Sequence, residues 1–174
     1  MNCWTCFRGC EPYFTGKTQP SATYSKASGM KPNLLARNSP RDYIMIENLS
    51  PQQCWELLQQ NADAILVDVR TKMEHTFVGH PPGAVHIPWK EAPDWQLNPN
   101  FAAEVQAAVP NRNAPILLLC RSGQRSLEAA QLLEQIGYKH LINILEGFEG
   151  PLDQNKHRGN LGGWRFHGLP WEQS

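Results

Sequence analysis

The chain has 174 residues, enough for one ordinary domain with some spare length and too few for two full-sized domains. Hydrophobic residues make up 41% of the sequence, so a packed core is available. Sixteen Lys and Arg residues balance sixteen Asp and Glu residues, and this zero net charge argues against nucleic acid as a partner, because phosphate binding needs an excess of cations. No apolar run approaches the roughly 20 residues that span a bilayer, so the sequence predicts no membrane insertion.

Charge and composition divide the chain near residue 40. Residues 1–40 carry five basic side chains against one acidic one, are rich in Ser, Thr, Gly and Pro, and show no periodic apolar pattern. Such a segment buries too little surface to offset its ordering entropy, so we expect a basic, disordered leader at 1–40 and one domain at 41–174. The acid-poor composition is compatible with an organelle transit peptide. We favour the simpler interpretation, a tail without function or a start at Met30, and hence a cytoplasmic protein.

Five cysteines are an odd and small number, so no disulfide framework is expected and at least one thiol stays free. Cys3, Cys6 and Cys10 lie in the leader with the spacing C-x2-C-x3-C. A closed zinc site needs four ligands, and the six histidines show neither an i,i+4 pair nor an H-E-x-x-H motif. We interpret the leader cysteines as reduced or incidentally oxidised thiols, with zinc binding as the alternative.

The first predicted strand is the β-rich run at 43–46, and a helix follows it. Ser50, Pro51 and Gln53 have the types preferred at the N-cap, first and third positions of a helix, which Asn61 ends. The run at 64–67 is continuously apolar, as expected of a strand buried on both faces.

Later elements continue the alternation of strand and helix. The sequence predicts a strand at 84–87, a helix between 98–99 and 110, a strand at 116–119, a helix at 126–136 stopped by Gly137, and a strand at 141–145. The run at 116–119 is the most apolar and is the predicted central strand. Strands that alternate with helices indicate a mostly parallel sheet covered on both faces.

Sites in such sheets form outside the carboxyl ends of strands, so the chemistry is expected just after residue 119. The residues there are Cys120, Arg121, Ser122, Gly123, Gln124, Arg125 and Ser126. A thiol between a strand end and a helix N-terminus meets N–H groups and the positive end of the helix dipole, which both favour thiolate. Two arginines suit an oxyanion substrate, Gly123 permits the turn, and Ser126 is the expected N-cap. We interpret Cys120 as an activated nucleophile rather than a structural thiol.

This loop resembles the active-site loop of the rhodanese-like sulfurtransferases, which has the form C-R-x-G-x-R-S. Asp68 and Arg70 resemble the family's D-x-R segment. Residues 79–88, 145–148 and 164–170 resemble its G-H-I-P-G-A-x-x-I-P, L-E-G-G and W-x-x-x-G-L-P stretches, with Pro81 in place of isoleucine and Phe148 in place of glycine. The resemblance covers about residues 42–171.

The resemblance implies an α/β fold, a three-layer sandwich with a central, mostly parallel five-stranded sheet and helices on both faces. It implies that the Cys120 thiolate takes sulfane sulfur from a donor such as thiosulfate and passes it, through a persulfide, to cyanide or a cellular thiol. Residues 121–126 would bind the substrate: the amides of 121–125 would cradle the persulfide, and Arg121 and Arg125 would orient the donor. Asp68 and Arg70 would support the loop as an ion pair. No metal or organic cofactor is implied.

Two alternatives to a general sulfurtransferase fit the sequence to different degrees. Rhodanese-related phosphatases carry H-C-x5-R, whereas the spacing here is Cys120-x4-Arg125 with Leu119 before the cysteine, so the shorter loop disfavours phosphatase and arsenate reductase activity. A persulfide carrier or regulatory module that serves one partner protein stays open, although the sequence keeps the cysteine and both arginines.

Residues 149–163 form a loop insertion relative to short family members, between the last strand and Trp164. It follows a strand's carboxyl end, so a lid over Cys120 is one interpretation. A solvated surface loop is the one we favour.

Overall fold

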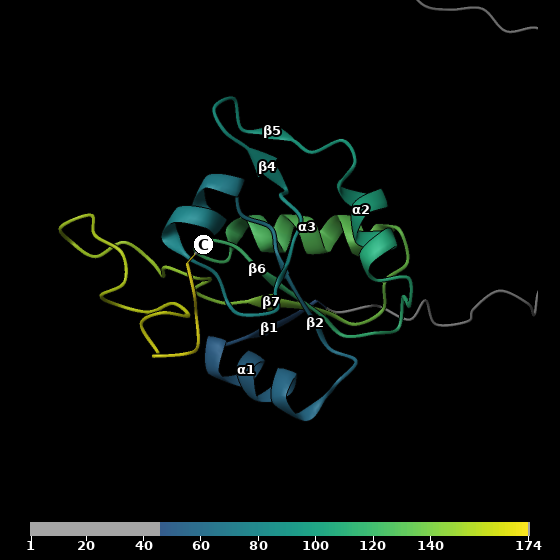
Figure 1. Cartoon of the computed structure of the whole chain (residues 1–174), viewed down its shortest axis with the longest axis horizontal. Coiled ribbons are helices and arrows are strands. Elements are labelled where there is room, and N and C mark those ends of the chain that lie inside the picture. The colour runs from purple at the N-terminus through teal and green to yellow at the C-terminus, as the bar shows by residue number, and fades with distance from the viewer. Residues whose placement is uncertain (1–45, 174) are drawn as a thin grey trace, which may run out of the picture. The chain divides into compact units, whose positions relative to one another are not determined.

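A computed structural model describes residues 46–173 of the chain (Figure 1). The predicted leader at 1–40 and the three cysteines in it lie outside these residues. A parallel sheet of five strands has the order β1-β7-β6-β2-β3. Its strands are β1 (Glu47–Leu49), β2 (Ile65–Asp68), β3 (Val85–His86), β6 (Ile116–Leu119) and β7 (Leu141–Ile144). The strand at 116–119 therefore has the predicted bounds and the predicted central place.

Helices cover both faces of the sheet. α1 (Pro51–Gln60) lies on one face, and α2 (Phe101–Ala108) and α3 (Gln124–Gln135) lie on the other (Figure 1). The start of α1 is the predicted capping box, in which the Ser50 hydroxyl accepts from the Gln53 amide at 3.3 Å and the Gln53 side chain accepts from the Ser50 amide at 2.9 Å. The three-layer α/β sandwich predicted from the sequence is confirmed.

The central strand β6 divides its side chains between the two halves of the core. Ile116 and Leu118 pack in the cluster that includes side chains of α2 and α3, and Leu117 and Leu119 pack in the cluster that includes Cys54 of α1. All four are fully buried. Side chains of a strand point to alternate faces, so a strand covered on both sides must be apolar throughout, which explains the continuous run.

Two predicted elements have other bounds in the structure. The described strand at this sheet edge is Glu47–Leu49, which begins after the predicted end at residue 46, because Glu47 pairs with Ile142 and Leu49 pairs with Ile144 where a polar sequence is tolerated. Of the predicted run, only Ile46 lies in the described part of the chain. α3 begins two residues earlier than predicted, so its N-cap is Gly123 and not Ser126.

Two elements were not predicted. A π-helix, η1 (Glu74–Val78), follows β2, and a hairpin of β4 (Lys90–Glu91) and β5 (Gln96–Leu97) follows β3. Neither is long enough to produce an apolar period in the sequence. Both lie near the carboxyl ends of the parallel strands, and both contribute side chains to the site described below.

No helix within residues 46–173 is long and apolar enough to cross a membrane.

Candidate active site

Cys120 follows the last residue of β6 and is 1% exposed. Its Sγ accepts a hydrogen bond from the Gly123 amide at 3.1 Å and lies 3.2 Å from the Ser126 hydroxyl, which can donate a second one. Gly123 caps α3 with a φ of 93°, a left-handed conformation that a side chain would oppose. The turn at Gly123 thus folds the chain back so that one amide and one hydroxyl face a single sulfur atom. Donors arranged in this way stabilise negative charge on sulfur.

Of the two arginines in the loop, Arg125 is held by an acidic partner that lies far away in the sequence. Its Nη1 and Nη2 donate to the two carboxylate oxygens of Glu74, in η1, at 2.8 and 2.7 Å. Burial raises the pKa of Glu74, but the Arg125 hydrogen bonds and charge outweigh it, so the pKa of Glu74 lies below its usual value. The Arg125 guanidinium also lies 5.4 Å from the centre of the Trp95 ring. Arg125 is therefore a paired cation in a fixed position.

Asp68 and Arg70 form a fully buried ion pair beneath η1. Arg70 Nη2 donates to Asp68 at 2.6 Å and to the carbonyl oxygen of Gly79 at 2.7 Å, and His75 Nδ1 lies 2.9 Å from the same carboxylate. Burial alone would raise the pKa of Asp68, but the hydrogen bonds from His75 and Arg70 and the Arg70 charge lower it to about 2. The pair connects the end of β2 to both ends of η1, the element that presents Glu74 to Arg125.

The ring of His75 lies in a stack of three imidazoles. It stacks on the ring of His80 at 3.8 Å and on that of His86 at 4.2 Å. Each ring is oriented by a hydrogen bond at Nδ1 or Nε2: His75 to Asp68, His80 to a backbone oxygen of η1, and His86 to the Arg70 carbonyl. Burial lowers the pKa of His86. No group of three or more His, Cys, Asp or Glu side chains within residues 46–173 could hold a metal ion.

A cavity of about 370 Å³ opens over Cys120. It is lined by Cys120 and its loop residues Arg121, Ser122, Gln124 and Arg125, and by Lys90 and Trp95 of the hairpin. Lys90 is paired with Glu128 at 2.7 Å, and Arg125 is paired with Glu74. Arg121 differs from these cations, because its buried Nε has no hydrogen-bond partner among the described residues. Of the three cations that line this cavity, Arg121, the residue after Cys120, is thus the one without an acidic partner among the described residues.

The other side of the loop rests on the segment after β7. The amides of Phe148 and Glu149 donate to the carbonyl oxygens of Cys120 and Arg121 at 2.8 and 3.0 Å. A Cβ at Gly147 would lie 2.6 Å from the carbonyl carbon of Arg121, so only glycine permits this approach. Phe148, which stands where the family pattern has glycine, is fully buried, and its ring packs under the Arg70 guanidinium at 4.1 Å.

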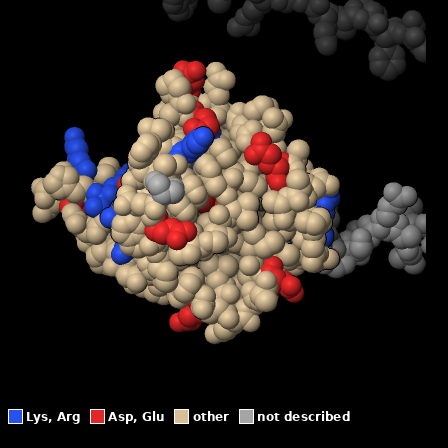
Figure 2. Space-filling model, viewed as in Figure 1, with Lys and Arg blue, Asp and Glu red and all other residues tan. Residues whose placement is uncertain are grey.

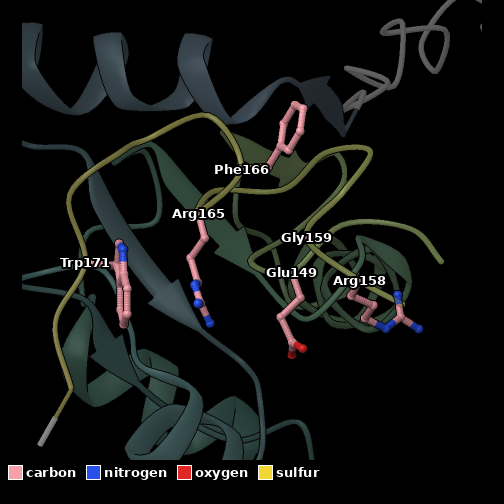
Figure 3. A pocket seen from close by; sticks show the side chains of 6 residues that line it. All are labelled: Glu149, Arg158, Gly159, Arg165, Phe166 and Trp171. Atoms are coloured by element: carbon pink, nitrogen blue, oxygen red, sulfur yellow. The ribbon is translucent and has the colours of Figure 1, made fainter. Parts of the chain in front are cut away.

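The insertion at 149–163 does not line the cavity over Cys120. Its residues Glu149, Arg158 and Gly159 instead line a second cavity of about 320 Å³, which Arg165, Phe166 and Trp171 complete (Figure 3). The Asp153 side chain organises the tip of the insertion, accepting from the amides of Asn155 and His157 at 2.8 Å each. The two cavities share no lining residue. The Cys120 cavity is instead bordered by the β4–β5 hairpin, which was not predicted.

Charged side chains of both signs lie on the face of the molecule seen in Figure 2. The acidic groups lie apart from one another, and basic groups are most frequent over the C-terminal segment (yellow in Figure 1). No single sign dominates this face.

One polar residue close to Cys120 was not predicted from the sequence. Asn143 is 3% exposed in the middle of β7, and its Oδ1 lies 2.7 Å from the Ser126 hydroxyl. A polar side chain inside an otherwise apolar buried strand was the available signal, because such a group needs a hydrogen-bond partner.

Comparison with known proteins agrees with this fold. A family profile described as the rhodanese-like domain matches residues 50–151. An uncharacterized protein of Rickettsia conorii is 38% identical over 133 residues, covering 74% of this chain and 99% of its own. Thiosulfate sulfurtransferase GlpE of Haemophilus influenzae is 34% identical over 107 residues, covering 62% of this chain and 89% of its own. The crystal structure of Rv0390 from M. tuberculosis superimposes with a TM-score of 0.67 and 42% identity, covering 74% of this chain and 98% of that one. The chain belongs to the rhodanese-like domain family.

Proposed function

We propose that the protein is a sulfurtransferase that moves sulfane sulfur from a donor such as thiosulfate to a thiophilic acceptor through a persulfide on Cys120. The observation that carries the proposal is the placement of Cys120 Sγ, which faces the Gly123 amide at 3.1 Å and the Ser126 hydroxyl at 3.2 Å at a cavity of about 370 Å³. Membership in the rhodanese-like family, and relatives named thiosulfate sulfurtransferase, support the reaction class.

The first half-reaction forms one S–S bond and breaks another. The Cys120 thiolate attacks the outer sulfur of thiosulfate, the S–S bond of thiosulfate breaks, and its electron pair leaves with sulfite. Charge is conserved, because thiolate and thiosulfate dianion become persulfide anion and sulfite dianion. In the second half-reaction, cyanide or a cellular thiolate attacks the terminal sulfur and the Cys120 thiolate is restored. This is covalent catalysis in two steps, so ping-pong kinetics are expected.

The negative charge that develops on the terminal sulfur needs donors in the loop. α3 begins at Gln124, and the first amides of a helix have no partner in the helix itself, so the amides that follow Gly123 are available to the persulfide. The donor's sulfonate group is assigned to Arg121, because Arg125 is already bound by Glu74. In this proposal Arg125 supports the cavity wall and adds positive potential, and it does not need to contact the sulfur donor directly.

Intact mass after incubation with thiosulfate tests the proposal. The wild type should gain one sulfur atom and lose it again when a thiol is added, and Cys120→Ser should gain none. Cys54→Ser is the matched control, because Cys54 is fully buried in α1 and burial raises its pKa to about 12, which leaves it unreactive. Loading of Cys120→Ser at the wild-type rate would overturn the proposal.

The assignment of Arg121 has its own test. Arg121→Ala should raise the KM for thiosulfate roughly tenfold or more, as expected for loss of a charge-assisted hydrogen bond, and Arg121→Lys should recover part of it. The second half-reaction with cyanide should change less, because cyanide carries no sulfonate. An unchanged KM for thiosulfate in both variants would refute this role.

A carrier that serves one partner protein is the second candidate function. The open cavity and the exposed Trp95 at its wall favour it, since an aromatic side chain beside a nucleophile can contact a protein surface. Rapid loading by thiosulfate, followed by sulfur release to one protein and not to small thiols, would support it. Small-molecule acceptors and a cytoplasmic location remain part of the main proposal.

A further inference from the structure

A chain of hydrogen bonds leads from the sheet edge to the nucleophile. Asn48 of β1 and Asn143 of β7 occupy the same register of neighbouring parallel strands, and Asn143 Nδ2 donates to Asn48 Oδ1 at 2.9 Å. This contact uses the amide nitrogen of Asn143 and turns its Oδ1 toward α3. There Oδ1 lies 2.7 Å from the hydroxyl of Ser126, which is itself 3.2 Å from Cys120 Sγ.

The Ser126 hydroxyl has one proton and three acceptors within reach. These are Asn143 Oδ1 at 2.7 Å, the Gly123 carbonyl oxygen at 3.1 Å and Cys120 Sγ at 3.2 Å. A serine hydroxyl donates one hydrogen bond at a time. The distance to Asn143 is the usual one for an O–H···O bond, so Asn143 competes with the sulfur for this proton. Ser126 is fully buried, which leaves bulk water little part in the competition.

We propose that Asn143 is a positioning residue that acts through Ser126 on the balance between thiol and thiolate at Cys120. Asn143 Oδ1 competes with Sγ for the hydrogen bond that the Ser126 hydroxyl donates, and it accepts this bond when negative charge leaves Sγ. The proposal rests on the proposed function only in taking Cys120 as the nucleophile. In the thiolate state, the charge on sulfur attracts the proton toward Sγ. In the persulfide state, the charge lies on the terminal sulfur and the hydroxyl turns to Asn143. The buried hydroxyl is thereby satisfied in both states, whereas an unsatisfied one would penalise sulfur loading.

The competition predicts opposite effects for two neighbouring side chains. Removing Ser126 takes a donor from the thiolate, so the thiol form is favoured. Removing Asn143 takes away a competing acceptor, so Ser126 donates more fully to the sulfur and the thiolate form is favoured. A side chain that merely packed against Ser126 would disturb the donor when removed and would act in the same direction as loss of Ser126. The direction in which removal of Asn143 shifts the balance between thiol and thiolate at Cys120 therefore distinguishes the proposed role from simple packing against Ser126.

The test is the pH dependence of the rate at which iodoacetamide modifies Cys120, measured on full-length protein without thiosulfate. Quantifying the tryptic peptide that contains Cys120 excludes signal from the other cysteines. Asn143→Ala should lower the midpoint of the profile by about half a unit to one unit, the value expected for one neutral hydrogen bond, and Ser126→Ala should raise it. At pH values above both midpoints, loading by thiosulfate should be about two- to threefold slower in Asn143→Ala, because a more stabilised thiolate is less nucleophilic.

A double variant shows whether Asn143 acts through Ser126. In the Ser126→Ala background, Asn143→Ala should leave the midpoint unchanged, because the proton for which it competes is gone. Asn48→Ala provides a variant with little risk to folding, since Asn48 is exposed, and should lower the midpoint less by freeing the Asn143 amide to rotate. A midpoint that rises or does not move in Asn143→Ala, or a shift that persists without Ser126, would overturn the proposal. Because no donor is present, this result is independent of whether thiosulfate loads the protein.

Discussion

Replacing Asp68 by asparagine should leave the buried Arg70 without a counter-charge. Asp68 accepts five hydrogen bonds, one from the Arg70 amide, three from the Arg70 guanidinium and one from His75, at 2.6 to 3.1 Å. Neither member of the pair is exposed. Breaking a buried pair by removing one partner costs about 3–5 kcal/mol, a large part of the about 5–15 kcal/mol that stabilises a domain.

The low pKa of Asp68 gives a second, independent magnitude for its contribution to the free energy of unfolding. The folded-state value of about 2 lies below the ordinary value of 3.8, so the unfolded chain binds more protons than the folded one between these pH values. Stability therefore rises with pH through this window. The full contribution of about 2 kcal/mol is present above pH ~4 and is lost as the pH falls toward ~2. Asp68→Asn should remove this part of the acid sensitivity.

Urea unfolding at pH 7, followed by tryptophan fluorescence, measures the effect. Asp68→Asn should lower the midpoint by about 2 M, given a slope of about 2 kcal/mol per M. The control is Asp68→Asn combined with Arg70→Met, which removes both charges and should recover much of the loss. A loss below about 1 kcal/mol in the single variant, or a double variant no more stable than the single one, would refute the reasoning.

Three further outcomes follow from the geometry. Gly147→Ala should slow sulfur loading at least tenfold by displacing the Cys120 loop. Gly83 also has a positive φ but has open space at its Cβ, so Gly83→Ala should cost only about 1 kcal/mol of stability and leave loading unchanged. Equal loading in both variants would contradict the contact at Gly147. Trp95→Ala should raise the KM for an aromatic thiol acceptor several-fold without changing that for cyanide, so parallel changes for both acceptors would argue against a role in acceptor binding. Brief alkylation at pH 8 should modify the Cys120 peptide well before the Cys54 peptide, and mass mapping that gave the reverse order would show that burial does not protect Cys54.

Local sequence pattern was sufficient for the elements that build the sheet and for the position of Cys120 after the central strand. The apolar run at 116–119, the capping box at Ser50 and the stop at Gly137 depend on residues within a few positions of each other, and all three have the predicted place in the fold. Strand–helix alternation then implied a parallel sheet, and the carboxyl end of its central strand carries Cys120.

The predicted start of α3 failed for a physical reason. Ser126 has the type of an N-cap residue, but Gly123 turns the chain earlier, and the Ser126 hydroxyl is used by Cys120 and Asn143 instead. A side chain with several available partners cannot be assigned from its type alone, because the nearest partner depends on packing.

The sequence by itself therefore determined the fold class, the central strand and the loop that bears Cys120, since these follow from periodicity and from turn chemistry within short windows. The tertiary structure decided how the side chains around that loop are used. Arg125 is bound by Glu74, 51 positions away, and Ser126 shares its proton with Asn143, 17 positions away. Only folding brings these side chains together. No local pattern therefore records which cation is free or which hydroxyl faces the sulfur.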